Sequence, residues 1–147
     1  MTKNLNKVAK YNFERIIATS DQTRKLYELL ERREYKISHT NLPSYEEHCD
    51  FVKKNPYLHW YIVSDGPEHL GSFYIKKDNS IGLNIYSPSR AVLTACLDFI
   101  KRNFTPQNSI ASMVPDYFYI NVAYSNKKAI DILEDLGLSP IQISLRF

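Results

Sequence analysis

The sequence predicts an α/β (α+β) fold, with a mixed, mainly antiparallel sheet flanked by helices on both faces. Three strand-like runs, residues 58–63, 70–75 and 81–86, follow one another through short turns, which indicates antiparallel pairing. A fourth run, 117–123, leads through a polar turn into an amphipathic helix, and we expect it beside 81–86 at the centre of the sheet. With 147 residues, the chain is predicted to be a single domain spanning 1–147, long enough for a substantial core.

Composition argues against several classes of protein. The net charge of +3 is too small to indicate nucleic-acid binding, although it is compatible with a small anionic ligand. There is no apolar signal segment at the N-terminus and no run of membrane-spanning length, so we expect a cytoplasmic protein without a membrane partner. Cys49 and Cys96 fall on apolar helix faces outside any metal-like cluster, which predicts two free, buried thiols and no metal site.

The first elements follow from local patterns. Residues 1–10 are predicted to form a flexible tail. Residues 12–18 alternate, with Phe13, Arg15 and Ile17 on one side, and predict the first strand. Thr19 or Ser20 can cap the helix that follows, and its apolar face comprises Leu26, Leu29 and Leu30.

A second helix is predicted to begin at a capping box. Residues 35–43 show no clear period and are interpreted as a loop, after which Ser44 and Glu47 have the capping-box spacing. The apolar stripe of this helix contains His48, which we interpret as a buried histidine with a hydrogen-bond partner rather than a catalyst. The other members of the stripe are Tyr45, Cys49 and Val52.

In the C-terminal half, Gly82 falls inside a predicted strand, where we expect a bulge or a close backbone approach. Ser87 and Pro88 then predict the cap and first residue of a central helix. Residues 107–115 are left open between strand and loop, whereas 141–147 alternate and predict a terminal strand. The predicted buried face of the central helix comprises Val92, Cys96, Phe99 and Ile100.

Residues 121–140 carry the most informative motif. Asn126 is predicted to cap a helix with its side-chain oxygen, and Gly137 suits the left-handed residue that ends one. Ala129, Ile132, Leu133 and Leu136 share one face of that helix.

This motif resembles the C-terminal motif of the GNAT-superfamily N-acetyltransferases, roughly V-x-x-x-N-x-x-A-I-x-x-[YL]-x-x-x-G-[FL]. The predicted order of elements resembles that family over almost the whole chain. Two segments, LPSYEEHCDFVKK and WYIVSDGPEHLGSFYI, are similar to members that modify nucleotide-linked amino sugars in polysaccharide synthesis. The residues that match the motif are Val122, Asn126, Ala129, Ile130, Gly137 and Leu138.

The resemblance implies transfer of an acetyl group from acetyl-CoA to a small-molecule amine, such as a nucleotide-linked amino sugar, by a monomer or homodimer. In that fold two middle strands splay apart, and the pantetheine arm of acetyl-CoA pairs with their free backbone groups. The pyrophosphate rests on the N-terminus of the central helix. Residues 35–43 would then form part of the wall of the substrate site. The implied cofactor surface comprises Asn84, Ile85, Tyr86, Ser87, Ser89, Arg90, Ala91 and Asn126.

Two positions depart from the family pattern. Aligning the pyrophosphate motif [Q/R]-x-x-G-x-[G/A] with residues 90–95 puts Leu93 in place of glycine, where it would crowd the phosphate surface. Leu133 falls where many members carry the tyrosine that protonates the leaving thiolate. Tyr124, on the turn before the last helix, is the candidate substitute for that tyrosine, and water is another. The alternative hypothesis is therefore a GNAT-like binding or regulatory module without catalysis.

Overall fold

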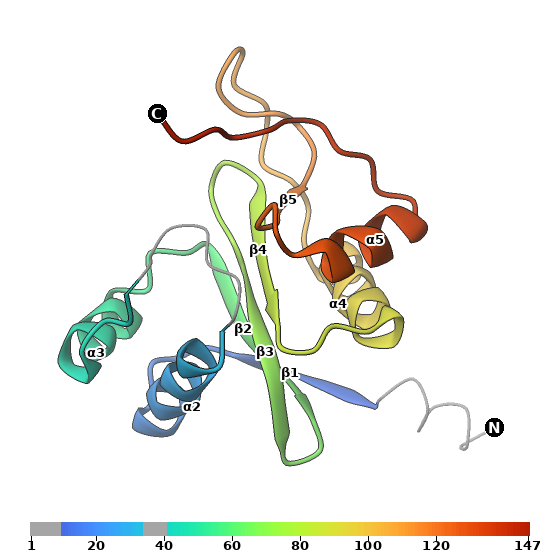
Figure 1. The fold of residues 1–147 in the computed structure, drawn as a ribbon. Helices are drawn as coiled ribbons and strands as arrows, with labels where there is room; N and C mark the ends of the chain where they lie inside the picture. The colour runs from blue at the N-terminus through green and yellow to red at the C-terminus, as the bar shows by residue number, and fades with distance from the viewer. Residues whose placement is uncertain (1–9, 34–40) are drawn as a thin grey trace.

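The computed structural model describes residues 10–33 and 41–147. One five-stranded sheet has the order β1-β2-β3-β4-β5, and every neighbouring pair is antiparallel except the parallel pair β4–β5. Figure 1 shows α2 and α3 on one face of the sheet and α4 and α5 on the other, so the predicted fold class is confirmed. The strands are β1 (Tyr11–Arg15), β2 (His59–Asp65), β3 (Glu68–Ile75), β4 (Ser80–Ile85) and β5 (Tyr119–Asn121), and the helices are α2 (Ser20–Glu31), α3 (Tyr45–Lys54), α4 (Arg90–Asn103) and α5 (Lys127–Asp135).

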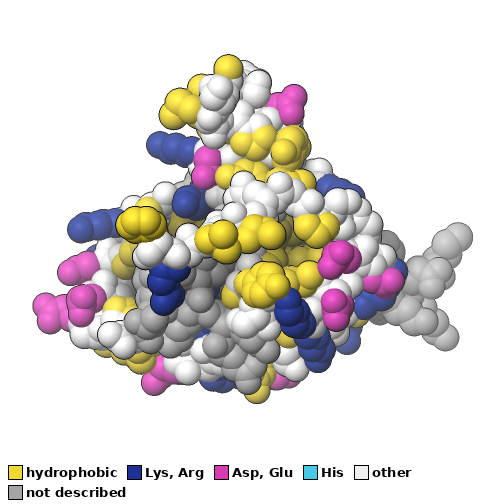
Figure 2. Space-filling model, turned by 45° about the horizontal axis from the view of Figure 1, so that its top comes forward, with side chains coloured by type: hydrophobic (Ala, Val, Ile, Leu, Met, Phe, Trp, Pro, Cys, Tyr) yellow, Lys and Arg dark blue, Asp and Glu magenta, His cyan; other side chains and the backbone are white. Residues whose placement is uncertain are grey.

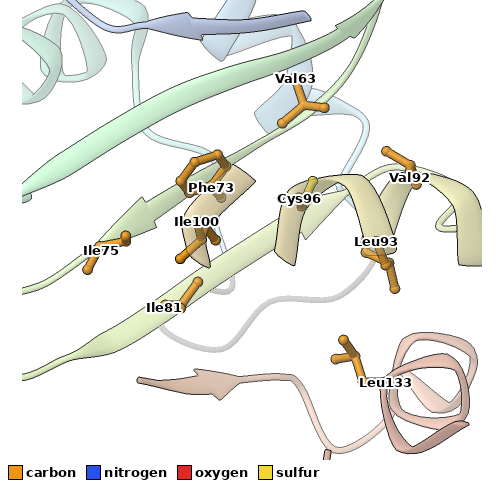
Figure 3. Close-up of a cluster of buried hydrophobic side chains, with 9 residues drawn as sticks. All are labelled: Val63, Phe73, Ile75, Ile81, Val92, Leu93, Cys96, Ile100 and Leu133. Atoms are coloured by element: carbon orange, nitrogen blue, oxygen red, sulfur yellow. The ribbon is translucent and has the colours of Figure 1, made fainter. Parts of the chain in front are cut away.

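Each face of the sheet buries its own hydrophobic cluster. The larger cluster fills the space between the sheet and α4, and Leu133 of α5 closes it on one side (Figure 3). The smaller cluster lies under α2 and α3 and includes Leu26, Val52 and Trp60. Odd-numbered residues of β2, of β4 and of residues 71–75 of β3 supply the first cluster, so their even-numbered neighbours face α2 and α3. Leu70 also packs against the first cluster, because the register of β3 shifts at this residue.

The predicted helix caps are largely confirmed. Thr19 caps α2, and Ser44 and Glu47 form both hydrogen bonds of the capping box at α3. Asn126 caps α5 through the amide of Ala129, and Gly137 follows the helix with a φ of 102°. The expected burial of His48 and its hydrogen-bond partner are confirmed as well, since its Nε2 lies 2.9 Å from the carbonyl oxygen of Thr23.

Strand β1 is shorter than predicted. It ends at Arg15, so the alternation does not continue to residue 17. Ile16 is buried, whereas Ile17 is 69% exposed, opposite to the expected side. The physical reason is the turn that follows, in which Ala18 adopts a positive φ of 58° and breaks the strand geometry before α2 begins.

The expectation of a central position for β4 and β5 is wrong. They lie side by side, but β5 is the last strand of the sheet. The terminal strand predicted at residues 141–147 would have extended the sheet beyond β5, and this segment has no assigned strand. Alternation alone does not make a strand, because a strand also needs a neighbouring backbone to pair with.

The C-terminal segment is instead extended and exposed. Its four alternating apolar residues are each more than half exposed. Residues 107–115 are likewise a loop, closed by an isolated bridge between Ile110 and Val114. Figure 2 shows hydrophobic side chains on the lobe at the top of the molecule and across the middle of the same face. The apolar residues of the C-terminal segment are Ile141, Ile143, Leu145 and Phe147.

Only one of the two cysteines is buried as predicted. Both thiols are free, but Cys49 is half-buried on α3, whereas Cys96 is fully enclosed under α4. Burial raises the pKa of the Cys96 thiol to about 12, so it stays protonated at neutral pH. In the part of the chain that the structure describes, no helix is long and apolar enough to cross a membrane.

Candidate functional site

The strands β4 and β5 diverge after a short paired stretch. Their parallel register covers Ser80–Tyr119, Ile81–Ile120 and Gly82–Asn121, and it ends there. Strand β4 nevertheless continues to Ile85, paired with β3 on its other side. The C-terminal half of β4 therefore has a strand on one side and an opening on the other.

Backbone groups of β4 point into this opening. The amide of Tyr86 donates to the carbonyl of Leu70 at 2.8 Å, so even-numbered residues of β4 direct their backbone groups toward β3. Because these directions alternate along a strand, the amide and carbonyl of Ile85 face the opposite way, where no β5 residue lies in register. An extended ligand can pair with them as an added strand.

The opening leads to the N-terminus of α4. The turn after β4 runs through Ser87, which has a positive φ of 51°, and Pro88. The predicted start of the helix at Ser87 is wrong. Ser89 is the N-cap, and its hydroxyl accepts from the amide of Val92 at 3.3 Å. The amides of Arg90 and Ala91 belong to the first turn, where helix amides have no intrahelical partner and favour an anion.

Two side chains of the implied cofactor surface are engaged elsewhere. The Arg90 guanidinium contacts the carboxylate of Asp135 at the end of α5, and both side chains are more than 60% exposed. Such a surface ion pair contributes only about 0–1 kcal/mol, so a phosphate can compete for Arg90. The side-chain oxygen of Asn126 accepts from the amide of Ala129, which leaves it a structural role as helix cap.

Both departures from the family pattern lie in the core. Leu93 is 1% exposed and belongs to the large cluster, so its side chain does not crowd the α4 N-terminus as expected from the alignment. Its amide bonds to the carbonyl of Ser89 at 3.1 Å. Leu133 is also buried in this cluster. A tyrosine at position 133 of this chain would have to bury its hydroxyl among aliphatic side chains.

Cations lie on two tyrosines near the opening. The Arg32 guanidinium at the end of α2 lies 5.0 Å from the ring centroid of Tyr86, which directly follows β4. Tyr124, the sequence-derived candidate acid, is 76% exposed, and the Lys127 ammonium lies 3.8 Å from its ring centroid. Residues 35–40 of the predicted substrate loop lie outside the described residues, and the Pro43 carbonyl accepts a hydrogen bond from the Tyr27 hydroxyl.

A tyrosine that the sequence analysis did not single out lies at the base of the opening. The ring of Tyr74 on β3 extends across β4 above Gly82, where a Cβ atom would lie 2.1 Å from its Cζ. The only signal in the sequence was Gly82 itself, for which a bulge or close approach was expected. The approach is made by a side chain, and the register shift lies instead in the β2–β3 pair, where Leu70 of β3 is the extra residue opposite Val63 and Ser64. Within the described ranges, no cluster of His, Cys, Asp and Glu is arranged to hold a metal.

No protein-family model and no curated protein matches the sequence. Solved structures do match its fold. The dodecameric spermidine N-acetyltransferase from Vibrio cholerae superposes with a TM-score of 0.54 at 16% identity, covering 88% of this chain and 79% of that chain. An aminoglycoside acetyltransferase from an uncultured soil metagenomic sample, in complex with trehalose or sisomicin, gives a TM-score of 0.52 at 11% identity, with 94% of both chains covered.

The protein therefore has the fold of the N-acetyltransferases. At these identities the likeness concerns the fold alone. Strands β4 and β5 diverge next to the N-terminus of α4. This place combines free backbone groups on β4 with a helix end that favours an anion.

Proposed function

We propose that this protein is an acetyl-CoA-dependent N-acetyltransferase that acts on a small-molecule amine. The observation that carries the proposal is the opening between β4 and β5, which ends at the N-terminus of α4. It matches the two chemical parts of acetyl-CoA, an extended arm with amide groups and a pyrophosphate.

The arm would pair with the amide and carbonyl of Ile85 as an extra strand. The pyrophosphate would then meet the first-turn amides of Arg90 and Ala91, and the Arg90 side chain would turn from Asp135 to the phosphate. The remaining residues of the implied cofactor surface would have smaller roles. Asn84, Tyr86, Ser87 and Ser89 would lie beside the bound cofactor between β4 and α4, and Asn126 would serve as the cap of α5.

The acceptor would be an amine, as it is in the reactions named for the structural neighbours, spermidine and aminoglycoside acetylation. Within that class we retain the nucleotide-linked amino sugar suggested by the helix and strand segments. The amine nitrogen would attack the thioester carbonyl, and the carbon–sulfur bond would break as the thiolate gains a proton. A cytoplasmic monomer or homodimer would suffice for this reaction.

The binding step is tested by calorimetric titration of acetyl-CoA into the wild type and Arg90→Ala. We expect Arg90→Ala to weaken binding by about 1–3 kcal/mol, the scale of a lost charge-assisted hydrogen bond, and added salt to weaken the wild type. Arg24→Ala is the matched control, because Arg24 is also an exposed arginine in ion pairs with carboxylates but lies on α2. It should bind acetyl-CoA as the wild type does.

Failure of the wild type to bind acetyl-CoA at millimolar concentration would remove the enzyme proposal. If Arg90→Ala and Arg24→Ala lose the same acetyl-CoA affinity, the loss reflects the overall charge of the protein and not a contact at the N-terminus of α4. Binding without turnover of any amine would favour the alternative, a binding or regulatory module. The buried Leu133, which stands where many members of the family carry the tyrosine acid, also favours this alternative.

A further inference from the structure

The hydroxyl of Tyr74 occupies a defined place above β4. A Cβ atom at Gly82 would lie 2.5 Å from this hydroxyl oxygen and 2.1 Å from the adjoining Cζ, so the end of the ring rests directly on the glycine. Any other residue at position 82 would displace it. Gly82 is also the last β4 residue that pairs with β5, opposite Asn121. The Tyr74 hydroxyl therefore lies where the two strands begin to diverge.

An aromatic stack fixes the ring of Tyr74. Tyr57 lies parallel to it, with ring centroids 3.9 Å apart and an interplanar angle of 10°. Trp60 in turn meets Tyr57 edge-on at 5.0 Å. Burial raises the pKa of Tyr57, and the neighbouring Tyr74 hydroxyl adds to this effect, so Tyr57 stays a neutral phenol. The stack holds Tyr74 in one orientation.

The direction of acetyl-CoA in the proposed site brings its thioester to this point. The pyrophosphate lies at the N-terminus of α4, which follows the C-terminal end of β4. An arm that runs from there along the free edge of β4 passes Ile85 and approaches Gly82 with its other end. That other end carries the thioester. The reacting sulfur would therefore lie near the Tyr74 hydroxyl, on the face of the sheet that carries α2 and α3.

Other hydroxyls near the divergence are less suited. Tyr119 pairs with Ser80, two residues before the point where the strands diverge. Its hydroxyl donates to the carboxylate of Asp78 at 3.4 Å. Tyr124 is largely exposed and lies beyond the end of β5, with the Lys127 ammonium over its ring. Tyr74 combines a fixed ring with a place at the base of the opening.

We propose that Tyr74 is the catalytic acid of this site, an inference that rests on the proposed acetyl transfer. The amine nitrogen forms a bond to the thioester carbonyl carbon, and the carbon–sulfur bond then breaks. The Tyr74 hydroxyl gives its proton to the departing sulfur, which leaves as the CoA thiol. The phenolate regains a proton from the nitrogen, which became positively charged on attack, directly or through one water. The products are the N-acetylated amine and CoA, and Tyr74 ends as it began.

The test compares Tyr74→Phe with the wild type, using acetyl-CoA with spermidine or sisomicin, and acetyl-CoA with water alone, while free CoA thiol is measured. We expect kcat to fall about 100-fold, within the range of general acid catalysis, while the calorimetric Kd for acetyl-CoA stays within about twofold. Tyr45→Phe is the control, because it removes an exposed tyrosine hydroxyl on α3 and should leave kcat unchanged.

Several outcomes separate the inference from the proposed function. No binding of acetyl-CoA by the wild type overturns the proposed function. Binding with full kcat in Tyr74→Phe overturns the role of Tyr74 alone, as does a loss of kcat confined to Tyr124→Phe. Binding without thiol release by the wild type overturns the catalytic role as well. If Tyr74→Phe does not fold, Tyr57→Phe replaces it, because this variant keeps the stack but removes the neighbouring hydroxyl. It should lower kcat severalfold at unchanged Kd, and an unchanged kcat would contradict the inference.

Discussion

Replacing Gly71 by alanine is expected to lower the free energy of unfolding by about 3 kcal/mol or more. Gly71 lies on β3 directly after the extra residue of its bulge, with a φ of 158°, and faces Ile85 across the β3–β4 pair. A Cβ atom there would lie 2.1 Å from the carbonyl oxygen of Asn84 and 2.8 Å from the Cα of Ile85. These are backbone atoms of β4, so no side-chain rotation relieves the clash. Urea denaturation measures the loss.

Gly66→Ala is the matched control for this substitution. Gly66 lies in the turn between β2 and β3 with a φ of 59°, and a Cβ atom there would meet nothing within 4 Å. Its replacement should cost only the left-handed strain, about 1–2 kcal/mol. If Gly71→Ala is no more destabilising than Gly66→Ala, then β3 and β4 do not approach as closely as described. Since β4 forms one wall of the opening, a folded Gly71→Ala should also bind acetyl-CoA more weakly.

Replacing Asn79 by alanine should be about as damaging, with an expected loss near 3 kcal/mol. The Asn79 side chain is fully buried in the turn before β4. Its amide nitrogen donates to the carbonyls of Gln107 at 3.1 Å and Pro115 at 2.7 Å, and its oxygen accepts from the amide of Gln107 at 2.7 Å. These hydrogen bonds fix both ends of the 107–115 loop, which precedes β5 in the chain. Alanine would remove all three of these hydrogen bonds and leave a cavity in place of a fully buried side chain.

Asn79→Gly separates the two contributions to this loss. Asn79 has a left-handed φ of 70°, which glycine adopts freely and alanine does not. Asn79→Gly should therefore recover about 1 kcal/mol relative to Asn79→Ala, while most of the destabilisation remains. Asn55→Gly is a second control, because Asn55 is also left-handed and its buried side-chain oxygen has no hydrogen-bond partner. A loss in Asn55→Gly equal to that in Asn79→Gly would contradict the hydrogen-bond account.

The features that the sequence predicts correctly are those decided within a few residues. The capping box at Ser44 and the cap at Asn126 depend on a side chain and an amide three positions away, so their spacing is sufficient. The antiparallel pairing of β2, β3 and β4 follows equally from their short turns.

Other features depend on contacts between distant segments. Ser87 and Pro88 have the pattern of a helix start, but the chain needs a left-handed residue at Ser87 to leave β4, and the helix begins at Arg90. Leu93 was assigned from a motif alignment, although its place one residue after Val92 and three before Cys96 already fits the buried face of α4. The ring of Tyr74 meets Gly82 only through the register of β3 and β4, which single-sequence patterns do not specify.

Binding of acetyl-CoA in the opening between β4 and β5 can be followed residue by residue through the amide chemical shifts of ¹⁵N-labelled protein. On titration with acetyl-CoA, we expect the largest shifts at the amides of Ile85, Arg90 and Ala91. The amide shifts of β1, at the opposite edge of the sheet from β5, should remain unchanged. Shifts gathered on β1 or α3, with Ile85 and the α4 N-terminus unaffected at saturating acetyl-CoA, would contradict the account.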